Sequence, residues 1–488
     1  MKKIKKTMLL FLPVLLAVCT FCGCRKTGEE ADDVVRLRWV TFGSTVPADI
    51  KEVVKAANEY SAEKIGVVVN LELQPSDMLN LIMASGEYYD IVYTCEWLNS
   101  FDKNVLRDQF YDITDLVQEE TPALYEIIGD YWEAAEVNGR LYGVPTLKDM
   151  GTEMMFRLNA DYFEGEKGMK IPEFMDFADI EPYLAAYKED FPYKYPLAMD
   201  KSGIPGFTNF MERIVGTFIL MPYGQEGIPE VLPVWDCEEL MNRYRLLHKW
   251  YELGYIQPDA SAVESTTADK TIPVRCGVAW RGYQGYSNPA DWGFQVKTSI
   301  YGGPYISRST EQGAMLAICS GCSEEHARAA LKYIELLNTD RKFRDILAYG
   351  IEGKHFNYLE NNTVIRTETG RSRYQPSLYP MGSVVNASVE SVSEDFLADP
   401  DQWTKVYEGY EEYGIHSSAY GFVYDKTRKE DIIAALTAIY ANYSTDLITG
   451  TSDPDVVIPK MREEMEKAGV RELLDDIQQQ LEEYLTNP

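Results

Sequence analysis

The sequence predicts an α/β fold with more than one hydrophobic core. Between residues 35 and 94, segments with the twofold periodicity of strands alternate with segments of helical periodicity. Such alternation is typical of a mostly parallel sheet joined by crossover helices. The chain has 488 residues, 45% of them hydrophobic, so it is long enough to build two or three ordinary cores.

The individual elements follow from local periodicity and from residues that end helices. Residues 35–42 alternate like a strand, and residues 47–64 carry apolar side chains at helical spacing. The other predicted elements are strands at 67–73 and 90–94, a helix at 78–84 closed by Ser85-Gly86, a turn and strand-like run at 138–145, and helices at 238–253, 324–337, 341–349, 459–468 and 470–485. The last helix carries a one-sided apolar stripe, which we expect to pack on a core.

The third predicted strand points to a first candidate ligand site. Open α/β sheets bind ligands at the carboxyl ends of their strands. The residues directly after this strand are Cys95-Glu96-Trp97. We therefore expect Glu96 and Trp97 to lie at the rim of a binding site.

The charge of the chain excludes several classes of partner. The formal net charge is −30 at pH 7. A field of that sign repels phosphate backbones and anionic lipid headgroups. We therefore expect no nucleic-acid binding and no electrostatic membrane binding.

The N-terminus resembles a bacterial lipoprotein signal. Four lysines between residues 2 and 6 precede a short apolar run at 8–18 and the sequence Phe21-Cys22-Gly23-Cys24. This pattern implies cleavage after residue 23, lipidation of Cys24 and a tether at 24–35. The alternative is a membrane-spanning helix, which needs about 20 apolar residues. We expect a protein held on the extracellular face of the cell membrane by its lipid alone.

The remaining cysteines do not form an obvious disulfide framework. Five are left after residue 24, namely Cys95, Cys237, Cys276, Cys319 and Cys322. An odd number leaves at least one thiol unpaired. The C-x-x-C pair at 319 and 322 is compatible with a small disulfide, with two packed thiols or with redox chemistry.

Several runs together resemble the extracellular solute-binding proteins of family 1, the capture subunits of bacterial sugar ABC importers. The runs are Met83-Ala84-Ser85-Gly86-Glu87 before Asp90-Ile91-Val92, Gly139-Arg140-Leu141-Tyr142-Gly143-Val144-Pro145, Gly277-Val278-Ala279-Trp280, Ala314-Met315-Leu316-Ala317-Ile318 and Gly350-Ile351-Glu352-Gly353-Lys354-His355-Phe356. Residues 416–488 look like the C-terminal domain of the LipO-type lipoprotein branch. The resemblance covers nearly the whole chain after residue 24.

The resemblance implies a two-lobed, type II periplasmic-binding-protein-like fold with hinge crossings and a helical C-terminal extension. Residues 36–146 and 312–365 would form the N-terminal lobe. Residues 150–308 and 366–488 would form the C-terminal lobe. A ligand held between the lobes as they close would be shielded from water and recognised by membrane permease subunits.

The residue inventory fits a carbohydrate ligand. A sugar site needs flat apolar faces for the C–H side of the ring and planar polar groups for its hydroxyls. The chain has 34 Tyr and 8 Trp, which favours an oligosaccharide over a monosaccharide. The expected ligand-binding residues, several of them carried over from the resemblance, are Glu96, Trp97, Lys148, Asp149, Trp280, Arg281, Tyr283, Trp292 and Tyr301. For each of the aromatic residues, packing within a core is the alternative interpretation.

Two other functions remain compatible with the sequence. A secreted glycoside hydrolase would use two carboxylates, but no catalytic motif marks any of the 77 acidic residues or the four histidines. A surface lipoprotein that binds peptides or glycans without import is the other alternative. We expect a monomer without cofactor, metal site or catalytic residue, and no calcium-loop pattern is present.

Overall fold

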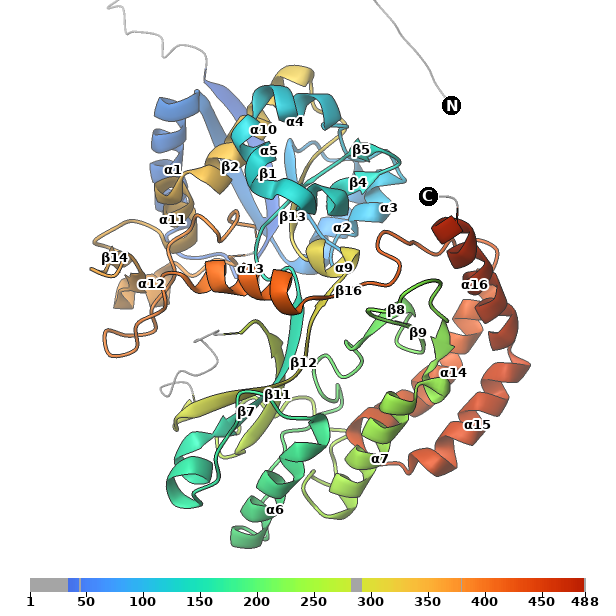
Figure 1. Ribbon diagram of the computed structural model, residues 1–488. Helices are drawn as coiled ribbons and strands as arrows, with labels where there is room; N and C mark the ends of the chain where they lie inside the picture. The colour runs from blue at the N-terminus through green and yellow to red at the C-terminus, as the bar shows by residue number, and fades with distance from the viewer. Residues whose placement is uncertain (1–33, 44, 282–291, 379, 487–488) are drawn as a thin grey trace, which may run out of the picture. The chain divides into compact units, whose positions relative to one another are not determined.

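The computed structural model describes residues 34–43, 45–281, 292–378 and 380–486 (Figure 1). Residues from Val35 onward belong to one compact unit. The predicted signal peptide, Cys24 and Tyr283 lie outside the described residues. Within the described part of the chain, no helix has both the length and the hydrophobicity that a bilayer crossing requires.

One part of the structure is a five-stranded sheet with the helices around it, formed by residues 35–145 together with residues 315–373. Its elements are β1 (Val35–Phe42), α1 (Ile50–Ile65), β2 (Val67–Gln74), α2 (Ser76–Ser85), β3 (Ile91–Thr94), α3 (Phe101–Val105), α4 (Thr114–Glu120), α5 (Pro122–Ile128), β4 (Glu136–Val137), β5 (Arg140–Leu141), β6 (Val144–Pro145), β13 (Met315–Ile318), α10 (Glu324–Thr339), α11 (Arg341–Tyr349), β14 (Phe356–Tyr358), β15 (Val364–Arg366) and α12 (Glu368–Arg373). The strand order is β2-β1-β3-β13-β6. β1, β2 and β3 run parallel, whereas β13 pairs antiparallel with both β3 and β6.

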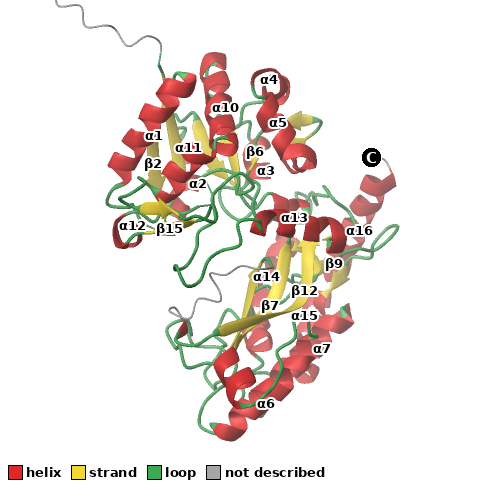
Figure 2. Cartoon of the chain, turned by 60° about the vertical axis from the view of Figure 1, so that its left-hand side comes forward, coloured by secondary structure: helices red, strands yellow, loops and turns green. Residues whose placement is uncertain are grey.

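Local sequence explains the sharp ends of the first helices. Gly66 ends α1 and Gly86 ends α2, and both adopt a left-handed conformation with φ of 67° and 71°. Glycine reaches this conformation without a steric penalty, and it closes a helix by redirecting the chain. The buried indole of Trp39 on β1 then meets Tyr333 of α10 edge to face, with ring centroids 6.1 Å apart. This contact lies in a first hydrophobic core that α1, α10 and α11 surround (Figure 2).

The second part of the chain has its own sheet and its own core. Its elements are β7 (Thr152–Asn159), α6 (Glu181–Asp190), β8 (Met211–Val215), β9 (Ile219–Pro222), β10 (Leu232–Pro233), α7 (Glu238–Glu252), β11 (Val274–Ala279), β12 (Val296–Ile306) and β16 (Ile415–His416), whereas α9 (Arg308–Glu311) and α13 (Gln402–Tyr413) lie between the two parts in sequence and pack beside the segment that joins the two sheets. The main sheet has the order β11-β7-β12-β16, and β8, β9 and β10 form a small separate sheet. The ring of Phe156 on β7 stacks against Phe177 at 5.8 Å, at the centre of this second core.

The C-terminal helices complete the second core. They are α14 (Glu430–Thr449), α15 (Pro454–Lys467) and α16 (Val470–Thr486); α14 and α15 run beside α7 in Figure 1, and α16 packs against both of them. Val470, Leu473, Ile477 and Leu481 of α16 are all buried in the core. The predicted apolar stripe of this helix is therefore a packing face.

The boundary between the lobes differs from the prediction after residue 366. The resemblance assigned residues 366–488 to the C-terminal lobe, but Met381, Val406 and Tyr410 are buried in the first core. Tyr407 and Tyr410 donate hydrogen bonds to the carbonyls of Lys148 and Gly151. The chain therefore joins the second core only at β16, because the apolar face of α13 packs against the crossing that connects the two sheets.

Candidate ligand-binding site

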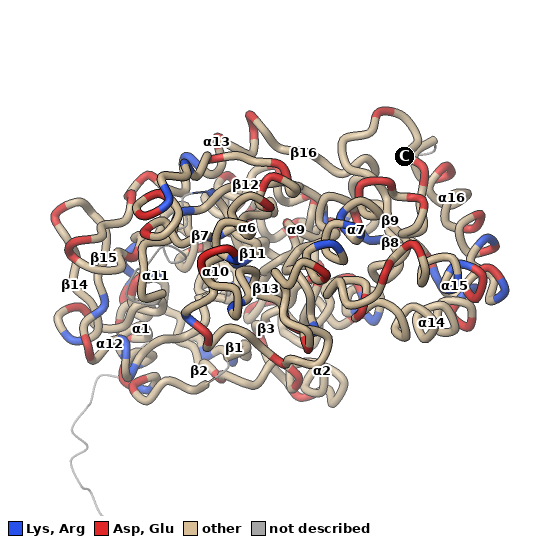
Figure 3. The backbone as a smooth tube through the Cα atoms, turned by 90° about the horizontal axis from the view of Figure 1, so that it is seen from below, with Lys and Arg blue, Asp and Glu red and all other residues tan. Residues whose placement is uncertain are grey.

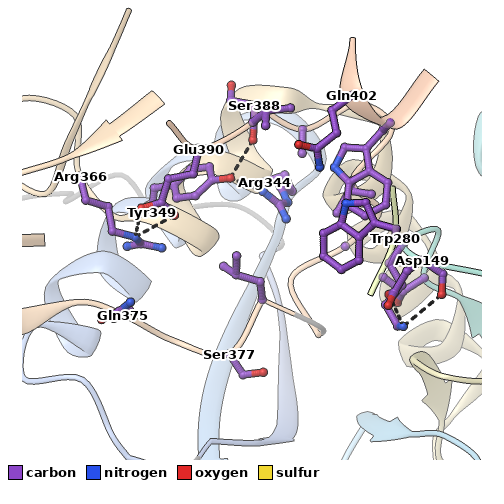
Figure 4. A pocket seen from close by; sticks show the side chains of 18 of the residues that line it. Asp149, Trp280, Arg344, Tyr349, Arg366, Gln375, Ser377, Ser388, Glu390 and Gln402 are labelled. Atoms are coloured by element: carbon purple, nitrogen blue, oxygen red, sulfur yellow. Dashed lines mark hydrogen bonds and ion pairs between the residues drawn. The ribbon is translucent and has the colours of Figure 1, made fainter. Parts of the chain in front are cut away.

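A pocket of about 660 Å³ lies beside the first crossing, residues 146–151, which connects β6 of the first sheet to β7 of the second. Its walls come from five stretches: Thr146 to Asp149 in the crossing, Trp280 after β11, Arg344 and Tyr349 of α11, the chain from Arg366 to Val392, and Gln402 and Trp403 at the start of α13. Figure 4 shows Asp149 and Trp280 at one side of this pocket and Tyr349 and Arg366 at the other. Segments far apart in sequence thus meet at one site.

Two tryptophans form an aromatic wall of the pocket. Trp280 directly follows the last residue of β11, and Trp403 lies in the first turn of α13. Their ring centroids are 4.9 Å apart and the ring planes differ by 32°. Both side chains are half-buried, and both line the pocket. A flat apolar surface of this kind suits the C–H face of a ring-shaped ligand.

Polar side chains stand close to the aromatic wall. Lys148 Nζ lies 2.5 Å from Asp149 Oδ1, and the two side chains are 12% and 24% exposed. Gln402, Gln375 and Ser377 also line the pocket. These groups supply hydrogen-bond donors and acceptors. The backbone of Lys148 is held in place by the Tyr407 hydroxyl, which donates a 2.9 Å hydrogen bond to the Lys148 carbonyl.

A second cavity shares Trp403 with the first. It has a volume of about 860 Å³, and its acidic lining residues are Asp130, Glu133, Glu311 and Glu411. Burial raises the pKa of Glu311 to about 7, and the Tyr420 hydroxyl donates a hydrogen bond to its carboxyl group. The described residues that line this cavity include neither Lys nor Arg. The two neighbouring cavities therefore differ in the sign of their charge.

The sequence-predicted residues fall into two groups in the structure. Lys148, Asp149 and Trp280 line the first pocket. Glu96 and Trp97 are exposed at the end of β3. The indole of Trp97 donates a 3.0 Å hydrogen bond to the carbonyl of Gly313, and a methyl group on Gly313 would lie 3.1 Å from Lys148 Nζ. Trp97 thus stands near the crossing, at the edge of the site.

The other predicted residues have different surroundings. Arg281 forms an ion pair with the buried Glu153 at 2.9 Å. Trp292 packs against the cationic groups of Lys270 and Arg275, outside the residues that line the pocket. Tyr301 is 8% exposed and its ring lies 4.5 Å from that of Phe156 in the second core. None of these three side chains is among the residues that line the first pocket.

The placement of Tyr301 gives a testable expectation. Its buried hydroxyl has no hydrogen-bond partner among the described residues. Tyr301→Phe removes this buried polar group, so we expect the free energy of unfolding to stay the same or to rise by about 1 kcal/mol. Ligand affinity should not change. Thermal unfolding and a binding titration of the variant check both points, and a loss of affinity would instead assign Tyr301 to the ligand.

Sequence reasoning missed several pocket residues. Trp403, Gln402, Arg344 and Tyr349 line the pocket but were not among the expected ligand contacts. One sequence signal could have indicated Trp403, because it is one of the eight tryptophans from which the other aromatic candidates were drawn. Arg344 and Tyr349 lie in a helix whose periodicity indicates only packing.

Comparisons with known proteins agree with the architecture. The family DUF3502, a domain of unknown function, matches residues 418–486. A carbohydrate ABC transporter substrate-binding protein of Streptococcus pneumoniae serotype 4 (strain ATCC BAA-334 / TIGR4) is 25% identical over 512 residues, which cover 97% of this chain and 96% of the relative. Lipoprotein LipO of Bacillus subtilis (strain 168) is 22% identical over 283 residues, covering 56% of this chain and 55% of LipO.

A solved structure extends the similarity to the fold. The N-glycan transport solute binding protein NgtS of Streptococcus pneumoniae superposes with a TM-score of 0.81 at 22% identity, covering 93% of this chain and 99% of NgtS. The two-lobed solute-binding architecture implied by the sequence is thereby confirmed. The resemblance expected from the sequence is confirmed: the chain is similar over nearly its whole length to a carbohydrate ABC transporter substrate-binding protein and over about half of it to lipoprotein LipO, with the DUF3502 match at its C-terminus.

Proposed function

We propose that this chain captures an oligosaccharide in the first pocket and delivers it to the permease subunits of an ABC transporter. The observation that carries the proposal is the wall formed by Trp280 and Trp403 beside the Lys148–Asp149 ion pair. Stacking surfaces next to fixed polar groups are the chemistry that sugar rings require. The volume of about 660 Å³ lies within the usual range for ligand pockets, roughly 300–1,000 Å³.

The relatives support the same ligand class. The Streptococcus relative is named for carbohydrate binding and ABC transport, and NgtS is named for N-glycan transport. NgtS has also been solved in complex with Man1GlcNAc and with Man5GlcNAc. These names belong to binding proteins, so the proposal assigns no catalytic step to this chain.

The location on the cell is the second part of the proposal. We place the protein on the extracellular face of the membrane, as a monomer anchored through lipidated Cys24. The N-terminal pattern of lysines, apolar residues and cysteine supports this location, and so does the relative named as a lipoprotein.

Thermal unfolding against a ligand panel tests the proposal. A protein of residues 25–488 contains the whole compact unit that begins at Val35. We expect an oligosaccharide at about 100 times its Kd to stabilise this protein by roughly 2.7 kcal/mol. Trp280→Ala should lower the affinity by about 10-fold or more, because 1.4 kcal/mol of lost contact already corresponds to tenfold.

Matched variants and ligands make the result specific. Trp235→Ala removes a partly buried tryptophan of the second core that does not line the pocket, so it should leave affinity unchanged. Stabilisation by short peptides and by no carbohydrate would overturn the ligand class. Turnover of a bound glycan into products would contradict the assignment as a binding protein.

A further inference from the structure

We infer that the captured glycan carries an anionic group, which the pocket receives at its arginine-rich end. This inference rests on the proposed function and deepens it by naming the charge of the ligand. The arginine-rich end is formed by Arg344, Arg366 and Arg371. Figure 4 shows Arg344 between the tryptophan side of the pocket and Arg366.

The charge of the pocket lining opposes the charge of the chain. The lining contains four cationic side chains and two carboxylates, in a protein of net charge −30. Figure 3 shows acidic residues on helices in both parts of the chain, including α15 and α16. A locally cationic pocket in an acidic protein is not expected from composition alone. It indicates that the pocket favours a negative charge.

Two of the four cations have a carboxylate partner at 3.0 Å or closer. Lys148 forms the ion pair with Asp149. Arg366 contacts Glu390 at 3.0 Å and donates two further hydrogen bonds to the carbonyls of Tyr374 and Ala348. These two cations therefore have their charge or their hydrogen bonds satisfied within the protein. The positive charge that the protein compensates least comes from Arg344 and Arg371.

Arg344 is buried with weak compensation for its charge. It is 2% exposed, and its Nε atom has no hydrogen-bond partner among the described residues. Its Nη1 atom donates to the Tyr349 hydroxyl at 3.3 Å and lies 4.0 Å from Asp345 Oδ1. That carboxyl group is itself buried, and it accepts hydrogen bonds from Ser388 and Tyr358. A guanidinium taken out of water needs a close anion to offset the loss of hydration.

Arg371 provides a second, more accessible charge. It is exposed on α12, and its Nη1 atom donates to the carbonyl of Arg366 at 2.6 Å. Within the described part of the chain, no carboxylate lies within 4 Å of it. A ligand anion at this end would thus meet one buried and one exposed guanidinium.

The geometry of guanidinium selects the class of anion. Guanidinium is planar and offers paired N–H donors that match the two oxygens of a carboxylate. A uronic acid residue in an oligosaccharide carries such a group, and a sulfate ester presents oxygens of the same charge. The second cavity, with four acidic residues in its lining, would repel either group. The anion is therefore assigned to the first pocket.

Calorimetric titration with matched glycan pairs tests this inference on the protein of residues 25–488. Each pair compares a uronate oligosaccharide of three to four sugars with its methyl ester, which keeps the shape but loses the charge. A sulfated oligosaccharide of the same length distinguishes sulfate from carboxylate. We expect the acid to bind at least about 10-fold more tightly than the ester at low ionic strength. This difference in affinity should decrease as salt is added, because salt screens the charges.

Two arginines of one helix provide the variant and its control. Arg371→Gln should weaken binding of the acid but not of the ester. Arg373 lies on the same helix, but its exposed charge pairs with Asp49 and it does not line the pocket. Arg373→Gln should therefore leave the affinity for the acid and the affinity for the ester unchanged. Equal or tighter binding of the neutral glycan would overturn the inference and leave the proposed function standing. Failure of every glycan, acidic and neutral, would overturn both.

Discussion

Replacing Trp403 with alanine is expected to lower affinity for the captured glycan by roughly 10- to 100-fold, about as much as replacing Trp280. The reason is that the two rings form one surface, with centroids 4.9 Å apart. An aromatic contact contributes about 0.5–1.5 kcal/mol beyond the apolar area that it buries. Loss of contact area and stacking together therefore corresponds to about 1.4–2.8 kcal/mol, or one to two factors of ten.

A double-mutant cycle separates the shared surface from two independent contacts. If Trp280 and Trp403 bind the ligand as one wall, the double variant should lose less affinity than the sum of the two single variants. Titrations of the four proteins with the same oligosaccharide measure this coupling. Trp235→Ala again serves as the control, because it is the same substitution at a tryptophan that does not line the pocket. Unchanged affinity in Trp403→Ala would show that the ligand does not use this wall.

The first sheet could be predicted from the sequence because its signals are local. β1 spans the predicted residues 35–42, and α11 spans the predicted residues 341–349. β2 and α10 also agree with their predictions to within two residues at each end. Alternation, helical spacing and terminal glycines act within a few residues, so they can be recognised without tertiary information.

The C-terminal helices show where local signals fail. The helix expected at 459–468 begins at Pro454 instead, with the Asp453 side chain accepting a hydrogen bond from the N–H of Asp455. Pro459 was interpreted as a helix start, but it lies inside the helix. α14, at residues 430–449, was not predicted because few of its side chains are buried and its amphipathic pattern is weak. Tertiary packing, rather than local sequence, determines where α15 begins and stabilises α14.

The binding site could be predicted only where it lies close to recognisable segments. Asp149 and Trp280 follow strands, and the family resemblance pointed to both. Trp403 and Arg344 reach the pocket because α13 packs against the first crossing and because α11 ends beside it. No local pattern indicates that Trp403 and Arg344 meet the crossing, since they lie about 250 and about 200 positions from it in the sequence.

Glu311→Gln is expected to stabilise the protein at pH 8 and to have little effect at pH 4.5. Glu311 is 7% exposed, and burial raises the pKa of its carboxyl group from an ordinary value of 4.5 to about 7. The folded state therefore holds a proton on Glu311 that the unfolded state releases between these pH values. Stability falls as pH rises through this window, because the charged form is disfavoured only in the folded state.

The size of the stability change follows from the difference between the pKa values of Glu311 in the unfolded and folded states. A shift of one pKa unit corresponds to about 1.4 kcal/mol, so burial of the charged carboxylate lowers the free energy of unfolding by up to roughly 3 kcal/mol above pH 7. Glutamine has no charge to bury, and its amide oxygen can still accept the hydrogen bond from Tyr420. Unfolding temperatures of the wild type and the variant, measured from pH 4.5 to 8.5, should therefore diverge by several degrees as pH increases.

Glu411→Gln is the matched control for this pH dependence. Glu411 lines the same acidic cavity but is exposed, and it is not among the groups that raise the pKa of Glu311, so the variant should follow the wild type at every pH. A constant difference between Glu311→Gln and the wild type across the pH range would mean that the carboxyl group stays in one protonation state. A destabilised variant at pH 8 would mean that the charged carboxylate has a stabilising partner in the cavity. Divergence confined to Glu311→Gln instead identifies this carboxyl group, beside the first crossing and in contact with Tyr420 of the DUF3502 domain, as a source of pH-dependent stability.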